Sequence, residues 1–240
     1  MARELSLSGR TAIVTGASSG IGAATARELA AAGGTVVLAA RRESRLESLA
    51  TEIRADGGQA AVVPTDVTDE AAVEALVEAA IEEFGGLDIV VQNAGVGRGE
   101  DVQTLDTAAY REMMAVNVDG VFFLTRAALP HLLDSEGTMV FVGSFAGQYP
   151  RPYNPVYAAT KWWVRGFAKS VMARVGSEGG GVSIVNPSEV RTEFGSEDGD
   201  AYREQFDPGE VTEPDEIAAA VRFAAEQSPS TAAEIDLFRR

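Results

Sequence analysis

The chain has 240 residues, of which 45% are hydrophobic, so it can bury a large core and is expected to form one or two domains. It contains no cysteine, which excludes disulfides, a thiol nucleophile and a thiolate metal cluster. With 36 acidic and 20 basic residues the net charge is −16, which argues against nucleic acid and anionic membranes as general partners. An anionic ligand therefore needs a local positive site.

The N-terminal residues lack the apolar stretch of a signal peptide, and no apolar run approaches the roughly eighteen residues that span a bilayer. We therefore expect a soluble, cytoplasmic protein with no membrane partner. Of the 20 basic residues only Lys161 and Lys169 are lysine, a bias that fits a halophilic host or a GC-rich genome. We favour the halophile, although ordinary solvated acidic helix faces also explain the charge.

Short β-branched segments alternate with alanine-rich amphipathic segments along the chain, which is typical of βαβ units on a parallel sheet. The pattern predicts strands at 11–15, 35–40, 60–63, 87–91, 138–142, 182–185 and 233–237. It predicts helices at 20–32, 46–55, 70–84, 108–133 with a possible break, 156–175 and 215–226. A single α/β domain over residues 1–240 follows, with an irregular segment at about 192–211 that is long enough to cover a cleft.

A glycine-rich turn, TGASSGIG at residues 15–22, follows the first strand and opens the first helix. In this context backbone amides and the helix dipole can hold a pyrophosphate, and glycine is needed where a side chain would block close approach. Taken alone the turn is a weak signal, because glycine also ends strands and eases helix packing. The cofactor contacts predicted here are Gly16, Ser18, Ser19, Gly20, Ile21 and Gly22.

The second strand ends at Ala40, where an NAD-binding protein would place an acidic residue on the ribose hydroxyls. Arg41 and Arg42 follow directly, and a guanidinium there would pair with a 2′-phosphate. We assign Arg41 to that phosphate, whereas Arg42 is equally well explained as the start of a solvated helix. NADP(H) is therefore the predicted cofactor.

Tyr157 and Lys161 are four residues apart on a predicted helix, so the ammonium can lie beneath the phenol. Lowering the pKa of a phenol from about 10 to near 7 takes roughly 4 kcal/mol, which a cation in a dry cleft could supply. A Tyr and a Lys at this spacing also occur by chance in many helices. Because the chain has only two lysines, chance is the weaker explanation here.

Three more polar residues are candidates for the same site. Ser144 comes thirteen residues before Tyr157 and just past a strand, at the carboxyl edge of the sheet where α/β proteins bind ligands. It could donate to a substrate oxygen, and its alternative role is a turn residue or helix cap. Asn93 and Asn117 are by default a turn former or a buried polar residue.

Together these motifs resemble the classical short-chain dehydrogenase/reductase family, with TGxxxGxG at 15–22, NAG at 93–95 and YxxxK at 157–161 in matching order and spacing. The resemblance covers nearly the whole chain. It implies a Rossmann-type doubly wound domain with a seven-stranded parallel sheet flanked by helices, and it implies the branch that prefers NADP.

The resemblance also implies a catalytic tetrad of Asn117, Ser144, Tyr157 and Lys161. Tyr157 would be the general acid in reduction, and Ser144 would polarise the carbonyl. Lys161 would lower the pKa of Tyr157 and hold the nicotinamide ribose, and Asn117 would hold a water that links Lys161 to solvent. Asp66 and Val67 would contact adenine, and Thr192 the carboxamide. The remaining implied cofactor contacts are Asn93, Ala94, Gly95, Tyr157, Lys161, Pro187 and Val190.

The chain departs from the family pattern in two places. Ser188 replaces the usual glycine after Pro187, which concerns the local backbone path. Residues 233–240 lack the family's common VDGG ending, which argues against a ketoacyl reductase of fatty-acid synthesis. The ending is closer to enzymes that act on small 3-hydroxy acids, 3-oxo acids and related semialdehydes.

The sequence thus predicts an NADP(H)-dependent oxidoreductase that interconverts a carbonyl and a primary or secondary alcohol, needs no metal and forms a homotetramer or homodimer. Arg151 and Arg191 either meet a carboxylate of the small-molecule substrate or face solvent. The alternative function is a non-catalytic NADP-binding redox sensor. Such proteins tend to lose the tyrosine or the lysine of the pair, and neither is missing here.

Overall fold

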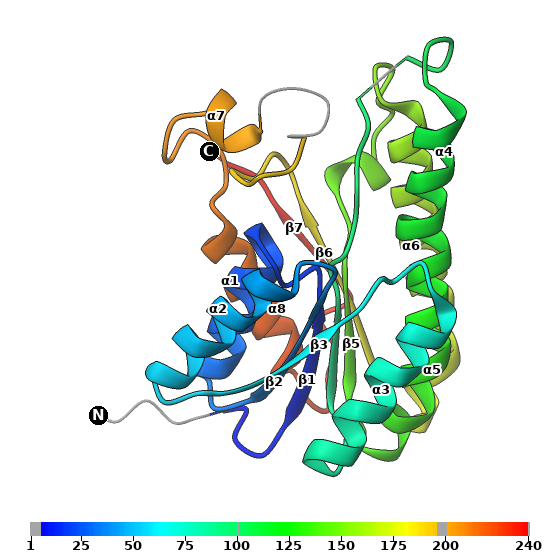
Figure 1. The fold of residues 1–240 in the computed structure, drawn as a ribbon. Coiled ribbons are helices and arrows are strands. Elements are labelled where there is room, and N and C mark those ends of the chain that lie inside the picture. The colour runs from blue at the N-terminus through cyan, green and yellow to red at the C-terminus, as the bar shows by residue number, and fades with distance from the viewer. Residues whose placement is uncertain (1–5, 100, 196–200, 240) are drawn as a thin grey trace.

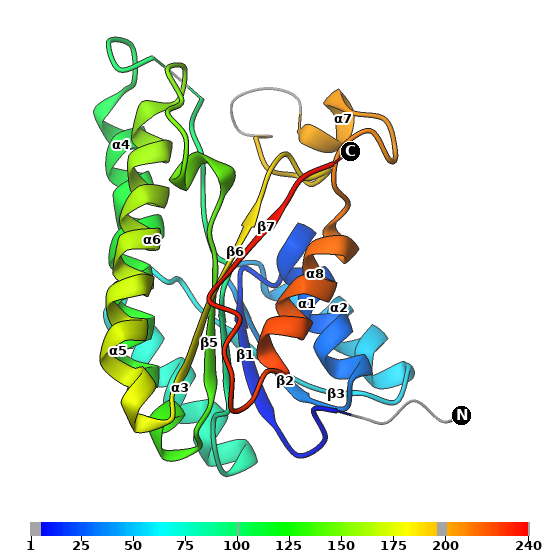
Figure 2. The ribbon, with the colours of Figure 1, turned by 180° about the vertical axis from the view of Figure 1, so that it is seen from behind.

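The computed structural model describes residues 6–99, 101–195 and 201–239. Seven parallel strands form one sheet in the order β3-β2-β1-β4-β5-β6-β7, and helices cover both of its faces (Figures 1 and 2). This confirms the predicted Rossmann-type, doubly wound sheet. The prediction of one domain over 1–240 includes residues 1–5, 100, 196–200 and 240, which lie outside the described residues.

The strands follow the predicted segments closely. They are β1 (Thr11–Thr15), β2 (Thr35–Ala40), β3 (Gln59–Pro64), β4 (Ile89–Gln92), β5 (Thr138–Val142), β6 (Gly181–Pro187) and β7 (Glu234–Leu237). All residues of β1, β4 and β5 are buried, as expected for parallel strands covered on both faces. The chain order reverses between β1 and β4, and the ends of these two strands therefore form the switch point at which open α/β sheets bind ligands.

Two helical layers complete the fold. Helices α1 (Gly20–Ala31), α2 (Glu43–Ala55) and α8 (Pro214–Ala225) bury their apolar sides in one core on one face of the sheet. Helices α3 (Glu70–Phe84), α5 (Gly120–Asp134) and α6 (Pro155–Val175) form the second core on the other face. The two layers lie on opposite sides of the sheet in Figure 1. None of the helices in the described ranges combines the length and apolar composition needed to span a bilayer.

The helix predicted at 108–133 is broken, as its sequence allowed. It consists of α4 (Thr107–Met114), a π-helical turn at Ala115–Asp119 and α5. A π turn holds an extra residue, and such turns are frequent at functional sites. This one contains the buried Asn117.

The segment predicted as irregular at 192–211 contains a short helix, α7 (Tyr202–Gln205), which the sequence pattern did not indicate. Residues 196–200 of this segment are among those outside the described ranges. Two single 3₁₀ turns, Phe145–Gly147 and Gly176–Glu178, complete the secondary structure of the described residues.

Candidate active site

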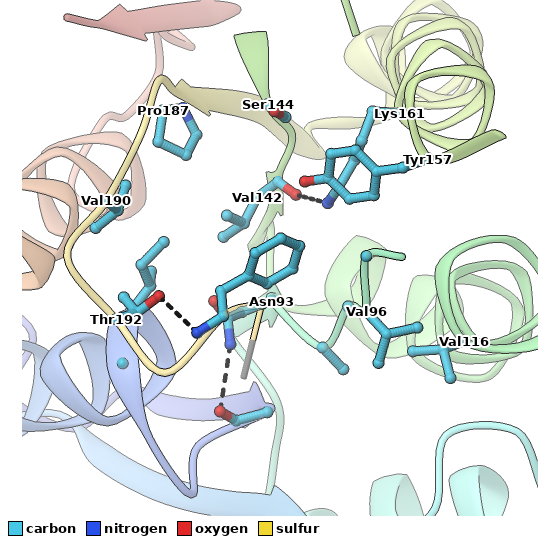
Figure 3. A pocket seen from close by; sticks show the side chains of 18 of the residues that line it. Asn93, Val96, Val116, Val142, Ser144, Tyr157, Lys161, Pro187, Val190 and Thr192 are labelled. Carbon is cyan, nitrogen blue, oxygen red and sulfur yellow. Dashed lines mark hydrogen bonds between the residues drawn. The ribbon is translucent and has the colours of Figure 1, made fainter. Parts of the chain in front are cut away.

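A cleft with a volume of about 760 Å³ lies at the carboxyl edge of the sheet (Figure 3). Two residues of the predicted site, Gly22 and Asn117, do not line it. The predicted residues that do line it are Gly16, Ser18, Ser19, Gly20, Ile21, Arg41, Arg42, Asp66, Val67, Asn93, Ala94, Gly95, Ser144, Tyr157, Lys161, Pro187, Val190 and Thr192. The fold therefore brings most of the predicted site into a single cleft.

The Tyr–Ser–Lys group meets at one place in this cleft. Tyr157 and Lys161 project from α6. Ser144 follows β5 and lies near the Tyr157 hydroxyl, and its Oγ accepts from the backbone N–H of Ala146 at 3.1 Å, the capping role that was its alternative. The Lys161 Nζ donates to the carbonyl oxygen of Val142 at 2.9 Å and lies 5.9 Å from the centroid of the Tyr157 ring (Figure 3). The predicted proximity of the three side chains is present, with the amine anchored on the end of β5.

The pKa of Tyr157 is raised, whereas the spacing of Tyr157 and Lys161 predicted a lowered one. Burial, together with the neighbouring Tyr202, raises the pKa of Tyr157 to about 12 and outweighs the effects of Ser144 and Arg151, which both lower that pKa. Burial also lowers the pKa of Lys161 to about 8. Both side chains are buried away from water. Burial disfavours the charged form of each, the phenolate of Tyr157 and the ammonium of Lys161, so the two pKa values shift in opposite directions.

Asn117 lies behind the wall of the cleft and is only 1% exposed. Its Oδ1 accepts from the backbone N–H of Val96 at 2.9 Å, and its Nδ2 donates to the Val96 carbonyl at 2.8 Å and to Thr160 Oγ1 at 3.1 Å. These bonds hold the turn after β4 against α6. Asn117 therefore fixes the backbone of the turn next to Gly95, and its bond to Thr160 joins that turn to the helix that carries Lys161.

Asn93 ties the ends of β1 and β4 together at the switch point. Its Nδ2 donates to the carbonyl of Thr15 at 2.8 Å, and the backbone N–H groups of Asn93 and Ala94 both donate to Thr15 Oγ1 at 3.1 Å. A Cβ on Gly16 would lie 2.7 Å from Asn93 Nδ2, and a Cβ on Gly22 would lie 2.3 Å from the Gly16 carbonyl oxygen. This close packing leaves no room for a side chain at Gly16 or Gly22. Gly22 therefore shapes the turn without lining the cleft.

The opposite end of the cleft has the features of an anion site. Ser19 precedes α1 but makes no side-chain capping bond, and the first turn of α1 has no acidic residue, so the positive helix end is not compensated locally. Arg42 NH2 donates to Ser18 Oγ and Ser19 Oγ, both at 2.8 Å. Arg42 therefore contacts the glycine turn. It also directly precedes α2 with a side chain that is 45% exposed, so it begins a solvated helix as well.

Arg41 differs from its neighbour. Its side chain makes no hydrogen bond or ion pair within the described part of the chain, and its charge helps to lower the pKa of Asp66. Burial opposes that lowering, but hydrogen bonds from Thr68 N at 3.0 Å and Thr68 Oγ1 at 2.8 Å, together with Arg41, outweigh it. The cleft thus offers the N-terminus of α1 to a diphosphate and the guanidinium of Arg41 to a further phosphate. These two groups suit a dinucleotide that carries an additional phosphate.

Several lining residues were not anticipated. The ring of Phe194 lies 5.6 Å from that of Tyr157 and 5.9 Å from that of Tyr202, so an aromatic wall faces the Tyr157 phenol. The sequence predicted that segment 192–211 covers a cleft, which placed these residues near the site. It did not predict which side chains of the segment face the cleft. Glu193, between Thr192 and Phe194, also lines the cleft.

The two arginines considered for a substrate carboxylate are placed differently. Arg151 lines the cleft, with its guanidinium 4.7 Å above the Phe145 ring and 3.7 Å from Glu189 Oε1. Arg191 does not line it, and its Nε donates to the backbone carbonyl of Phe206 at 3.1 Å. Within the described ranges, no three His, Cys, Asp or Glu side chains are grouped to hold a metal ion.

Comparisons with known proteins agree with this geometry. A family model described as short chain dehydrogenase matches residues 10–203. The D-threitol dehydrogenase of Mycolicibacterium smegmatis is 34% identical over 240 residues, which cover 98% of this chain and 92% of that protein.

Solved structures show the same relationship. An alcohol dehydrogenase from the archaeon Thermococcus sibiricus, complexed with 5-hydroxy-NADP, has a TM-score of 0.88 at 30% identity over 96% of both chains. The 3-ketoacyl-(acyl-carrier-protein) reductase from Brucella melitensis, complexed with NADH, has a TM-score of 0.87 at 31% identity over 97% of this chain and 98% of that one. This chain therefore belongs to the short-chain dehydrogenase family of oxidoreductases.

Proposed function

We propose that the protein is an NADP(H)-dependent oxidoreductase that interconverts a carbonyl and a primary or secondary alcohol. A single observation carries this proposal: the cleft that contains Tyr157, Ser144 and Lys161 also contains the N-terminus of α1 and Arg41. One ligand with a redox group and phosphates can therefore reach both ends of the cleft. When bound, the nicotinamide cofactor supplies or accepts the hydride at the substrate carbon.

Distinct parts of the cleft would hold distinct parts of the cofactor. The glycine turn with the backbone amides of α1 would hold the diphosphate, and Arg41 the 2′-phosphate. Asp66 and Val67 line the cleft where the adenine would lie, and Thr192 where the carboxamide would lie. The Lys161 amine would bind the nicotinamide ribose.

Tyr157 is the proton donor in the reducing direction. Because its pKa is raised to about 12, the phenol carries its proton at neutral pH and can transfer it to a carbonyl oxygen. Ser144 lines the cleft near the same hydroxyl and would donate to the same substrate oxygen, where negative charge grows. The hydrogen bond of the Lys161 amine to the Val142 carbonyl oxygen at 2.9 Å keeps it next to this pair.

The substrate is a small molecule that fits against the aromatic wall formed by Phe194 and Tyr202. Arg151 and Glu189 line the cleft and form an ion pair, so they offer both a donor and an acceptor to a polar substrate. The candidates are 3-oxo acids, 3-hydroxy acids and semialdehydes. Sugar alcohols join them, since a relative is named a D-threitol dehydrogenase.

We also propose a cytoplasmic homodimer or homotetramer. Phe122 on α5 and Trp162 on α6 are large apolar side chains that are 41% and 46% exposed. These two helices cover the same face of the sheet, and association with a second copy would remove their apolar side chains from water.

The test is Tyr157→Phe, assayed by NADPH oxidation across a panel of aldehydes, ketones and 3-oxo acids. Loss of the proton donor should reduce turnover about 100- to 10,000-fold, while NADPH binding followed by fluorescence persists. Tyr149→Phe is the matched control, because Tyr149 is 49% exposed and does not line the cleft, and it should turn over normally. Near-normal turnover in Tyr157→Phe would refute the assigned acid. Wild-type protein that binds NADPH but reduces nothing in the panel would favour the redox sensor.

A further inference from the structure

Glu193 places a negative charge at the end of the cleft that the proposed function assigns to a phosphate. Its Oε2 lies 2.6 Å from Arg45 NH1 and 3.3 Å from Arg42 NH1, and its Oε1 lies 3.0 Å from Arg203 NH1. The side chain is 24% exposed, so solvent screens these contacts only in part. The carboxylate of Glu193 therefore forms ion pairs with three guanidinium groups.

The same guanidinium that binds Glu193 also binds the glycine turn. Arg42 uses NH1 for Glu193 and NH2 for the hydroxyls of Ser18 and Ser19. Burial opposes the ionised form of Glu193, but the hydrogen bonds from Arg45 and Arg42 lower its pKa. Glu193 is thus an anion at neutral pH, and it uses donors that could otherwise serve a phosphate at this end of the cleft.

The backbone on either side of Glu193 is held in place. A Cβ on Gly20 would lie 3.1 Å from Thr192 Cγ2, and a Cβ on Gly97 would lie 2.4 Å from Phe194 Cζ, so both neighbours of Glu193 pack closely on the cleft wall. Arg203 N also donates to the Thr192 carbonyl at 2.9 Å. The packed neighbours therefore keep the Cα of Glu193 within reach of Arg42 and Arg45.

We propose that Glu193 is a resident counter-ion of Arg42 and Arg45 that competes with the cofactor's 2′-phosphate and so sets how strongly the protein discriminates NADP(H) from NAD(H). This inference rests on the proposed function, since it needs the dinucleotide to bind with its 2′-phosphate near these arginines. A phosphate dianion must share the arginine donors with the carboxylate and is repelled by it, whereas a ribose hydroxyl is not. Glu193 therefore weakens the preference for the phosphorylated cofactor that Arg41 and Arg42 create.

The test compares two probes that differ only in the 2′-phosphate, adenosine 2′,5′-bisphosphate and 5′-AMP. Their dissociation constants are measured by isothermal titration calorimetry on the wild type and on Glu193→Gln. The variant keeps the size of the side chain and removes its charge, so it should bind the bisphosphate about three- to tenfold more tightly and 5′-AMP equally well. In an Arg42→Gln/Arg45→Gln background, the gain from Glu193→Gln should disappear.

Glu204→Gln is the matched control. Glu204 belongs to α7, is 54% exposed and lies 3.6 Å from Arg203, and within the described ranges it forms no ion pair with Arg42 or Arg45. The Glu204→Gln substitution removes the same charge from the same segment, and it should leave the dissociation constants of both probes unchanged. An equal gain in this control would mean that the general negative field, rather than Glu193, opposes the phosphate, and it would overturn the inference.

Two further outcomes would also overturn the inference: an unchanged or weaker affinity of Glu193→Gln for the bisphosphate, and a gain that persists without Arg42 and Arg45. If Glu193→Gln does not fold, Glu193→Asp is measured instead. Its side chain is shorter by one methylene, so the carboxylate lies farther from the arginines, and the affinity for the bisphosphate should rise by a smaller factor. Wild-type protein that binds neither the bisphosphate nor NADPH contradicts the proposed function and the inference together. Wild-type binding with an unchanged ratio in the variant contradicts the inference alone.

Discussion

At the residue scale, both lysines of this arginine-rich chain make a defined contact. Lys161 is 7% exposed and donates to the end of β5, while Lys169 Nζ lies 2.8 Å from Glu234 Oε2. The Lys161 site is buried and offers one carbonyl acceptor at 2.9 Å, which suits a compact ammonium better than a planar guanidinium with five donors. The lowered pKa of Lys161, about 8, follows from the same burial.

The end of β2 provides a residue-scale test of the cofactor preference. Ala40 and Arg41 line the cleft, and Ala40→Asp with Arg41→Ala would replace an uncommitted cation by a carboxylate at the end of β2. The carboxylate can accept from ribose hydroxyls and repels a 2′-phosphate, so the ratio of kcat/KM for NADPH to that for NADH should fall by about tenfold or more.

The measurement for this double variant is steady-state kinetics with each cofactor. Arg27→Ala serves as control, because Arg27 is 47% exposed, pairs with Glu52 and lies outside the cleft. An unchanged ratio in Ala40→Asp/Arg41→Ala would count against the phosphate site.

At the scale of elements, the carboxylate of Glu234 adds side-chain contacts to the backbone pairing of β7 with β6. Glu234 Oε1 lies 2.5 Å from Arg165 Nε on α6 and accepts from Asn186 Nδ2 on β6 at 2.9 Å. Lys169, also on α6, binds its other oxygen. The four-residue edge strand β7 is thus bound to the helix that carries Tyr157, and this contact contributes to the position of that helix.

The bonds of Glu234 predict a pH dependence of stability. Hydrogen bonds from Arg165 and Lys169 lower the pKa of Glu234 to about 2, against burial, which raises it. A carboxyl whose folded-state pKa is lowered contributes stability above its unfolded pKa, near 4.5, and this contribution is lost as the pH falls toward 2. Glu234→Gln should therefore lower the free energy of unfolding by about 1–3 kcal/mol at neutral pH.

Urea unfolding of wild type and Glu234→Gln over a series of pH values measures this difference, which should shrink below pH 4.5. Glu78→Gln, an exposed position on α3, should show little difference from wild type at any pH. A Glu234→Gln variant as stable as wild type at neutral pH would show that these ion pairs do not stabilise β7.

At the scale of the whole molecule, the net charge of −16 produces mutual repulsion that favours expansion. Many of the arginines in the described ranges pair with carboxylates, for example Arg222 with Glu28 at 2.9 Å, but the acidic residues outnumber them. If this surface is a halophilic adaptation, the melting temperature should rise with KCl from about 0.1 M to about 3 M, beyond the range in which simple screening saturates near 1 M. Differential scanning fluorimetry measures this, and a flat or falling melting temperature at high salt would contradict the halophilic interpretation.

The sequence by itself determined the succession of strands and helices, the glycine turn and the Tyr157–Lys161 pair, because each is a local pattern within a few residues of the chain. It also allowed a break in the helix at 108–133, although it indicated neither the position of the break at 115–119 nor its π-helical form. The tertiary structure alone decided the rest. Glu193 meets Arg45 across 148 residues of chain only because the sheet order places the ends of β2 and β6 on the same cleft. Likewise the Tyr157 pKa rises where spacing predicted a fall, because desolvation depends on every neighbour that excludes water, and those neighbours come from all parts of the chain.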